Sequence, residues 1–446
     1  YLDNMKYLGS IFIALMLVIC NTTICAQISG TWHGFLQLGA NRLPVVFHID
    51  DSTMDSPAQN AFGIPVEIKV NNDTLAVEVA AIGARYIGAK NTECINGTFS
   101  QQGIVLNLDL REGDYVPPRP QTPQPPYPYY VEEVEFYNPI DSAKLSGTLS
   151  VPLMANIVGK SKIPVVIIVS GSGLQNRDGE IFNHKPYHVL ADYLANAGIA
   201  SLRYDDRGFA KSTGAVADAT TFTFAGDAEA VIDYLRSQQP SFKSVGVIGH
   251  SEGGTIAFIL AQKGKPDFII SLAGAAVRGD SILLKQNELG LKDAGLTAEV
   301  ISDYITALGR LIDALKIDGE CDMKSITADL SAITPEMEQN LQSIAETWKP
   351  WLDNFVKFDP ESAISETYCP VFALNGSNDR QVDSRQNLGA IERSLPHNSV
   401  SVVKEYPGLN HLFQHAPTGS VAEYGSIEET ISPEVLADIV AWIKSL

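Results

Sequence analysis

The sequence contains little cysteine and few basic residues. Five of its 446 residues are cysteine, and they form neither a C-x-x-C pair nor the His/Cys spacing of a metal site. Cys94, Cys321 and Cys369 lie far apart beyond the N-terminal segment, so buried thiols are expected, although the sequence leaves open whether two of them pair. Lys and Arg number 32 against 52 Asp and Glu, a net charge of −20. Because phosphate binding relies on clustered basic side chains, this balance argues against nucleic acid or anionic membrane surfaces as partners.

Cofactor-binding motifs are also missing. There is no glycine-rich phosphate loop followed by lysine, and no nicotinamide-binding fingerprint. The sequence therefore predicts no cofactor and no metal. It carries no signal for an oligomeric state.

The N-terminus reads as a targeting segment. A positive charge at Lys6 precedes an apolar run over residues 11–19, and the small residue Ala26 precedes Gln27. The run is too short to span a membrane comfortably. We expect residues 1–26 to be a signal peptide, the chain to be exported to the periplasm or beyond the cell, and the mature chain to have no membrane span.

A proline-rich stretch divides the rest of the chain. Seven prolines fall between Pro117 and Pro128, so residues 116–130 are expected to form an extended linker. Residues 27–115 contain short alternating segments separated by Asn, Asp and Gly turns, which predicts a small antiparallel β domain of sandwich or barrel type.

Residues 131–446 alternate between apolar strand-like runs and helical patterns. This rhythm predicts an α/β domain with a mostly parallel sheet and helices on both faces. Residues from about 277 to 360 are helix-rich without a strand signal. We expect a helical cap over the edge of the sheet where such folds bind ligands, the alternative being a separate helical appendage. Trp348 and Trp351 are candidates for its pocket wall or for ordinary packing.

One motif carries nucleophilic chemistry. Residues 249–253 read G-H-S-E-G, directly after an apolar run and directly before a helical pattern. A G-x-S-x-G between strand and helix is typical of a nucleophile elbow, which predicts Ser251 as the nucleophile. Gly249 and Gly253 are expected because strand and helix pass too closely there for side chains.

The nucleophile needs a base and a group that orients the base. In the chain order Ser, acid, His, the loop after a late strand provides Asp379 and the loop after the last strand provides His411. Among the alternatives, Asp383 is expected to cap the next helix, and His415 is expected to lie at the surface or to support the site from behind. His250 is expected to point away from the site.

Acyl transfer also needs donors for an oxyanion. The backbone N–H of Glu252, next to the nucleophile, is one candidate. The glycine-rich loop at residues 170–174 provides the other, which we assign to Ser172, although a simple glycine turn would read the same way.

From about residue 131 to the end, the chain resembles a serine hydrolase of the α/β-hydrolase fold, within the bacterial esterase and serine-aminopeptidase-like group. The resemblance rests on residues 170–179 and 203–208, on the Ser251 elbow, and on Asp379 and His411. It implies ester hydrolysis through an acyl-enzyme without a metal, and a bracing role for the charged turn at residues 205–208. Many relatives have His-Gly where this chain has Ser-Gly at residues 170–171; the backbone donors should survive this change.

These observations predict an exported serine hydrolase, a carboxylesterase that cleaves small to medium acyl esters through Ser251, His411 and Asp379. One alternative is a serine peptidase, either an aminopeptidase or prolyl-peptidase-like, acting on short peptides. Such an enzyme needs an acidic clamp for a free amine, for which Glu180 or an acidic residue of the cap is a candidate. A second alternative is binding of a glycan or a surface partner by the β domain, with the hydrolase secondary.

Overall fold

The computed structural model describes residues 28–38, 41–59, 61–155, 162–238, 242–317, 322–347 and 349–446. The chain forms two compact units that divide between Val116 and Pro117. The predicted signal peptide lies outside the described residues, as do Trp348 and Cys321. Within the described part, no helix combines the length and apolar character needed to cross a membrane.

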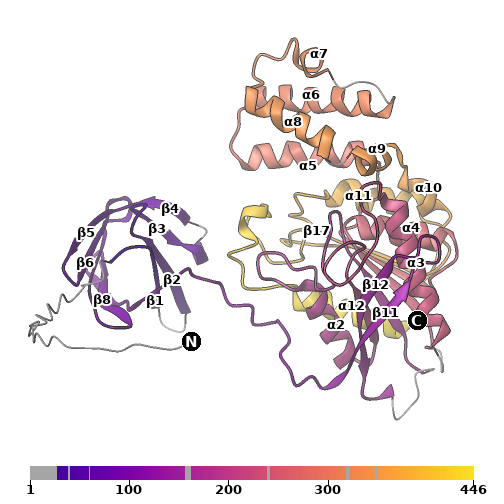
Figure 1. The fold of residues 1–446 in the computed structure, drawn as a ribbon, viewed down its shortest axis with the longest axis horizontal. Helices are drawn as coiled ribbons and strands as arrows, with labels where there is room; N and C mark the ends of the chain where they lie inside the picture. Colours follow the sequence, from indigo (N-terminus) through magenta and orange to yellow (C-terminus); the bar gives the residue numbers. More distant parts are fainter. Residues whose placement is uncertain are drawn as a thin grey trace, which may run out of the picture. The chain divides into compact units, whose positions relative to one another are not determined.

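The first unit is an antiparallel sheet in the order β4-β3-β2-β1-β10-β8-β7-β6-β5, with β9 paired to β8. Figure 1 shows the sheet curling around one core, in which Trp32, Phe47 and Tyr86 are buried. The expected antiparallel β region is therefore present. Its strands are β1 (Thr31–Leu38), β2 (Asn41–His48), β3 (Thr53–Ser56), β4 (Ala61–Pro65), β5 (Glu67–Asn71), β6 (Thr74–Val79), β7 (Ala84–Lys90), β8 (Cys94–Gln101), β9 (Ile104–Asn107) and β10 (Leu110–Glu112).

The second unit contains an eight-stranded sheet in the order β11-β12-β14-β13-β15-β16-β17-β18. The six strands from β14 to β18 in this order are parallel, and β11 and β12 are added antiparallel at one edge. The strands are β11 (Tyr129–Tyr137), β12 (Lys144–Pro152), β13 (Val165–Val169), β14 (Ala200–Tyr204), β15 (Val245–His250), β16 (Phe268–Leu272), β17 (Val371–Gly376) and β18 (Val402–Tyr406).

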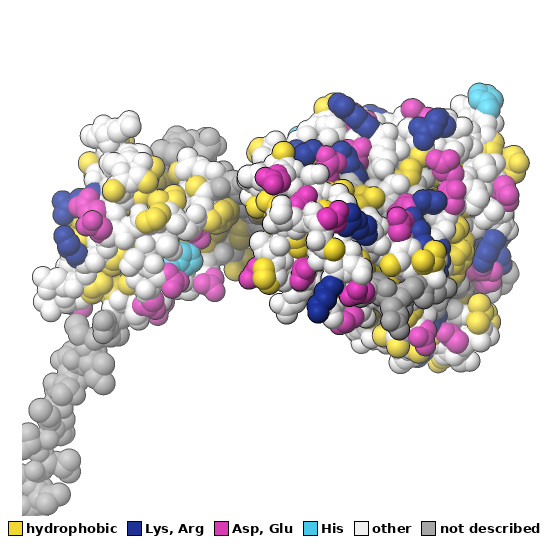
Figure 2. Space-filling model, turned by 90° about the horizontal axis from the view of Figure 1, so that it is seen from above, with side chains coloured by type: hydrophobic (Ala, Val, Ile, Leu, Met, Phe, Trp, Pro, Cys, Tyr) yellow, Lys and Arg dark blue, Asp and Glu magenta, His cyan; other side chains and the backbone are white. Residues whose placement is uncertain are grey.

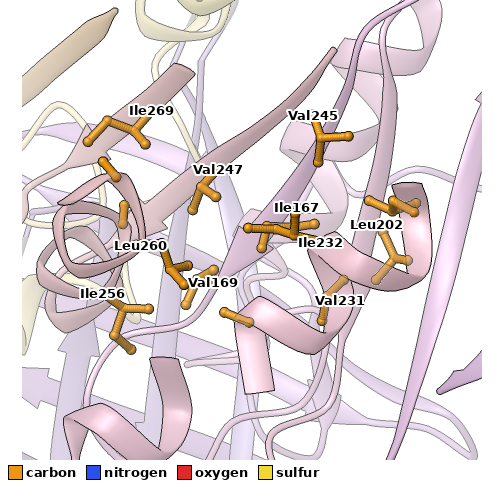
Figure 3. Packing of buried hydrophobic residues seen from close by; sticks show 14 of the residues in the cluster. Ile167, Val169, Leu202, Val231, Ile232, Val245, Val247, Ile256, Leu260 and Ile269 are labelled. Carbon is orange, nitrogen blue, oxygen red and sulfur yellow. The ribbon is translucent and has the colours of Figure 1, made fainter. Parts of the chain in front are cut away.

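Helices cover both faces of this sheet because its central strands are apolar on both sides. In β13, Val165, Ile167 and Val169 belong to one core cluster, and the alternate residues Val166 and Ile168 belong to the other. The first cluster takes its helical partners from α3 (Thr221–Ser237), α4 (Glu252–Gln262), α10 (Pro360–Ser365) and α11 (Ser384–Ser394), and Figure 3 shows part of this packing. The second takes them from α2 (Pro186–Asn196) and α12 (Pro433–Ser445).

A helical layer is inserted between β16 and β17, within the interval expected to form the cap. It consists of α5 (Gly279–Asp293), α6 (Ala298–Lys316), α7 (Met323–Thr327), α8 (Pro335–Thr347) and α9 (Lys349–Lys357). These helices share a core of their own that includes Leu308, Leu311 and Leu341. Figure 1 shows α5, α6 and α8 stacked as a layer of their own, and α9 packs against α3 of the sheet domain.

The proline-rich segment packs on the second unit. Residues 117–128 contain neither helix nor strand, as expected from their prolines. Arg119 donates to the backbone carbonyls of Phe182, Gly425 and Ile427 at 2.7–2.9 Å. Gln121 donates to the carbonyl of Ile431 at 2.7 Å. The segment was predicted to be a linker between domains, and these contacts hold its first part against the rest of the second unit.

Candidate active site

Ser251 lies at the sharp turn between β15 and α4. Its backbone has φ 56° and ψ −120°, a conformation that L-residues rarely adopt. The Ser251 N–H donates to the carbonyl of Leu272 on β16 at 2.9 Å, which fixes the turn against the sheet. Strained backbone of this kind is maintained only where the surrounding structure demands it, and it occurs often at functional sites.

Close packing around the turn accounts for its glycines. A Cβ on Gly249 would overlap the carbonyl of Gly253, and a Cβ on Gly253 would overlap the carbonyls of Val169 and Ser170. Gly171, which sequence reasoning did not single out, approaches the serine itself. A Cβ there would lie 2.9 Å from the Cβ of Ser251. The backbone of the loop at residues 170–174 therefore lies directly against Ser251.

Asp379 and His411 meet at the ends of β17 and β18. Asp379 Oδ2 lies 2.7 Å from His411 Nδ1, and Asp379 Oδ1 accepts the backbone N–H groups of Gln381 and Val382 at 2.8 Å each. Both side chains are buried. Since a carboxylate only accepts hydrogen bonds, Nδ1 of His411 carries the proton and Nε2 is left as the proton acceptor.

The loops that carry Asp379 and His411 lie in direct backbone contact. A Cβ on Gly376 would overlap the carbonyl of Leu409. The N–H of Asn378 donates to that same carbonyl at 2.9 Å. The alternative acid, Asp383, instead caps α11 by accepting the N–H of Gln386 at 2.8 Å. Of the two aspartates, only Asp379 lies against His411.

The two alternative histidines, His250 and His415, occupy different environments. His415 is exposed and pairs with Glu429 at 2.8 Å. His250 is packed beside His411, with ring centroids 4.7 Å apart, and its Nε2 lies 3.0 Å from the His411 carbonyl oxygen. Burial, with the His411 charge as a smaller cause, lowers the pKa of His250 to about 3. His250 is therefore neutral and donates from Nε2, so it holds the backbone of His411 in place. The expectation that His250 points away from the site is therefore wrong, because its ring packs against His411 and lines the same cavity as Ser251.

The two residues assigned to the oxyanion hole are linked through their side chains. Ser172 Oγ donates to Glu252 Oε2 at 2.7 Å. Glu252 begins α4, so its backbone N–H has no partner inside the helix. The Glu252 carboxylate is buried and also accepts from Thr221 Oγ1 at 2.6 Å and from Trp351 Nε1 at 2.9 Å. Thus Trp351 of α9 contacts the residue that follows Ser251.

The charged turn after β14 braces the loop beside Ser251. Asp206 accepts Ser170 Oγ at 2.7 Å and the N–H of Gln175 at 2.8 Å, which fixes both ends of the loop. Burial raises the pKa of Asp206 to about 7. Next to it, Asp205 binds Arg177, with Nη2 to Oδ2 at 2.7 Å. The resemblance implies that this charged turn braces its surroundings, and the segment that it braces is the loop at residues 170–174.

Two cavities lie beside the turn. One of about 390 Å³ is lined by Ser251, His411, Ser172, Glu252 and Trp351, among others. The other, of about 510 Å³, also has Ser172, Glu252 and Trp351 in its wall, but neither Ser251 nor His411. Cavities of this size suit small organic molecules. Within the described residues, no group of three His, Cys, Asp or Glu side chains is arranged to hold a metal ion.

Figure 2 shows one face of each unit. On the larger unit, basic and acidic side chains are interspersed on the visible face, with apolar side chains between them. The net negative charge of the chain is therefore not gathered into one patch on this face.

Comparison with known proteins adds to this geometry. The family model described as "Serine aminopeptidase, S33" matches residues 179–417. Esterase EstD of Thermotoga maritima is 28% identical over 304 residues, which cover 67% of this chain and 65% of EstD. The match thus spans less than two thirds of that relative.

Several solved structures are more distantly similar. An esterase of Pyrococcus furiosus has a TM-score of 0.45 and 16% identity, with 75% of this chain and 99% of that chain covered. Proline iminopeptidase of Mycobacterium smegmatis has a TM-score of 0.42 and 16% identity, with 70% and 98% covered. Est1E of Butyrivibrio proteoclasticus with bound ferulic acid has a TM-score of 0.40 and 17% identity, with 70% and 99% covered.

Proposed function

Because the chain belongs to the serine aminopeptidase S33 family, we propose that it is a serine hydrolase that cleaves carboxylic esters. The observation that carries the proposal is the 2.7 Å pair of Asp379 and His411, of which His411 lines the same cavity as the strained Ser251. Ser251 acts as the nucleophile, His411 as the base and Asp379 as the group that orients the base.

The reaction proceeds in two halves. Ser251 Oγ attacks the ester carbonyl carbon while His411 Nε2 takes the hydroxyl proton, and the carbonyl oxygen becomes an oxyanion. The backbone N–H groups of Glu252 and Ser172 donate to that oxygen. His411 then returns the proton to the leaving alcohol as the C–O bond breaks, which leaves an acyl group on Ser251. Water attacks the acyl-enzyme by the same route, and the acid is released.

The name and 28% identity of EstD favour an ester over a peptide bond. The family description and Glu180, which lines the same cavity as Ser251, favour the aminopeptidase alternative. Lys185 lies near Glu180, with Nζ 3.7 Å from Oε2, so this carboxylate already faces a cation. We therefore rank ester hydrolysis first. Turnover of 4-nitrophenyl butyrate without turnover of alanine 4-nitroanilide supports this order, and the reverse result would replace it.

The test of the nucleophile is labelling with a fluorophosphonate, read by mass spectrometry. We expect one adduct on Ser251, which is lost in Ser251→Ala and strongly slowed in His411→Ala. His415→Ala is the matched control, because this exposed histidine pairs with Glu429 and should leave labelling unchanged. A folded sample that forms no adduct, or labelling of His411→Ala at the wild-type rate, contradicts the assignment.

Export and the role of the β domain extend this proposal. We infer that residues 1–26 direct export to the periplasm or outside the cell, supported by the apolar run at residues 11–19. Sequencing the N-terminus of the purified mature protein should find Gln27 first, and retention of residues 1–26 refutes cleavage. The β domain remains a candidate for glycan or surface binding, which a glycan array probed with residues 27–115 tests.

A further inference from the structure

The two cavities beside Ser251 share one wall, and that wall is built from two parts of the fold. Ser172 and Glu252 come from the sheet domain, and Trp351 comes from α9 of the helical layer. The 2.7 Å bond from Ser172 Oγ and the 2.9 Å bond from Trp351 Nε1 both end on the Glu252 carboxylate. Phe355 stacks on the indole at 4.7 Å. Trp351 is thus held in a defined position between the cavities.

The position of His411 indicates which cavity holds the alcohol group of an ester and which holds its acyl group. The leaving oxygen must receive its proton from His411 Nε2, and His411 lines only the 390 Å³ cavity. The oxyanion donors Ser172 and Glu252 line both cavities, so the carbonyl group lies at their junction. With the alcohol on the His411 side, the acyl chain extends past Trp351 into the 510 Å³ cavity.

The surface that this larger cavity offers is mainly apolar. Phe224, Ile256, Leu174 and Val216 contribute to its wall. Its two acidic side chains already have partners. Asp206 accepts from Ser170 and Gln175, and Glu252 accepts from three donors. The part of the wall that remains available to a ligand is therefore apolar, and it suits a hydrocarbon chain better than a charged group.

We propose that the 510 Å³ cavity is the acyl pocket for linear acyl chains of medium length, and that Trp351, held by Glu252, controls entry to it. The proposal rests on the proposed function, since it takes an ester bound at Ser251 as its starting point. Each methylene that enters the pocket raises kcat/KM by up to about fourfold until the pocket is filled. A preference for medium over very short chains follows.

The experiment is a chain-length series of 4-nitrophenyl esters with acyl groups of two to twelve carbons. For the wild type, kcat/KM should rise from acetate toward octanoate and then fall. Phe224→Trp fills the pocket and should lower the octanoate-to-acetate ratio at least tenfold. Val216→Trp, on a more exposed segment, tests the same wall if the first variant does not fold. Phe222→Trp is the matched control, because it makes the same change two residues away on α3 outside the cavity wall.

Trp351→Phe tests whether Trp351 controls entry to the acyl pocket. It keeps an aromatic ring but removes the N–H that binds Glu252, so the ratio of octanoate to acetate should rise several-fold. A second series, acetate esters of alcohols of increasing length, should respond to neither pocket variant. A response in the alcohol series instead of the acyl series overturns the assignment, as does an octanoate-to-acetate ratio unchanged in both Phe224→Trp and Val216→Trp.

Fluorophosphonate labelling separates failure of this inference from failure of the proposed function. If Ser251 is labelled and acetate esters are cleaved, but the pocket variants leave the chain-length profile intact, only the acyl pocket is wrong. If Ser251 is not labelled and no ester is cleaved, the proposed function is wrong and the acyl pocket with it.

Discussion

Replacing Asp379 by asparagine is the sharpest single test of the site, because the structure dictates how the new amide must lie. The Oδ1 atom accepts two backbone N–H groups, from Gln381 and Val382, at 2.8 Å each. An amide nitrogen cannot take this place, since it would face two donors. In Asp379→Asn the oxygen therefore stays at Oδ1, and the NH₂ group takes the place of Oδ2, 2.7 Å from His411 Nδ1.

That orientation forces the wrong histidine tautomer. Nδ1 must now accept a hydrogen bond from the amide, so the imidazole carries its own proton on Nε2 and cannot take one from Ser251. We expect kcat to fall about 10³- to 10⁴-fold, or about 4–5.5 kcal/mol in the activation free energy. The free energy of unfolding should change by only about 1 kcal/mol, because the hydrogen bonds to the two backbone groups remain.

The assay is hydrolysis of 4-nitrophenyl butyrate, with thermal unfolding measured on the same samples. Asp383→Asn makes the same chemical change four residues later at the cap of α11, where asparagine is also a good cap. It should keep both activity and stability. An Asp379→Asn enzyme within tenfold of wild type, or an equal loss in both variants, would refute the reasoning.

Three further predictions follow from packing, charge and docking. Gly253→Ala should lower the free energy of unfolding by about 1–3 kcal/mol and impair fluorophosphonate labelling, because its Cβ meets the carbonyl of Val169; unchanged thermal unfolding contradicts this. Burial raises the pKa of Asp206 from 3.8 to about 7, so the folded state keeps a proton that the unfolded chain loses between these values. Wild-type stability should therefore fall relative to Asp206→Asn as pH rises from about 4 to 7, by an upper bound of about 4 kcal/mol, and parallel unfolding free energies across that range contradict it. Arg119→Ala should lower the free energy of unfolding by about 1–3 kcal/mol and speed proteolysis within residues 117–128, since three hydrogen bonds to backbone carbonyls are lost; an unchanged cleavage rate speaks against docking.

Much of the architecture was predictable because the local patterns agree with the fold. The continuous apolar run at residues 163–169 contains β13, which spans Val165–Val169 and whose side chains alternate between two cores. Asp379 and His411 were predictable for a topological reason. Each follows the end of a parallel strand, and parallel strands deliver the loops after them to the same edge of the sheet. The order of strands and loops along the chain was therefore enough to predict that the two residues lie at the same edge, before any distance between them was known.

The docking of the proline-rich segment could not be read in the same way. Prolines predict an extended backbone, but they do not say what lies beside it. The contacts that hold Arg119 go to carbonyls more than 300 residues away at Gly425 and Ile427. Any exposed loop has such carbonyls, so only the folded chain shows which ones the guanidinium meets.

The side chain of Glu252 illustrates a harder limit, and one with a functional consequence. The sequence singled out this residue for its backbone N–H, which any amino acid except proline at that position would supply. Its carboxylate is buried among donors from α3, α9 and the oxyanion loop, and Trp351 lies 99 residues along the chain. A motif search finds Ser251 and its glycines, but it cannot find the hydrogen bond between Trp351 of the helical layer and Glu252 of the sheet domain. If that contact controls entry to the acyl pocket, relatives with the same elbow will differ in chain-length preference according to the residues at positions 252 and 351.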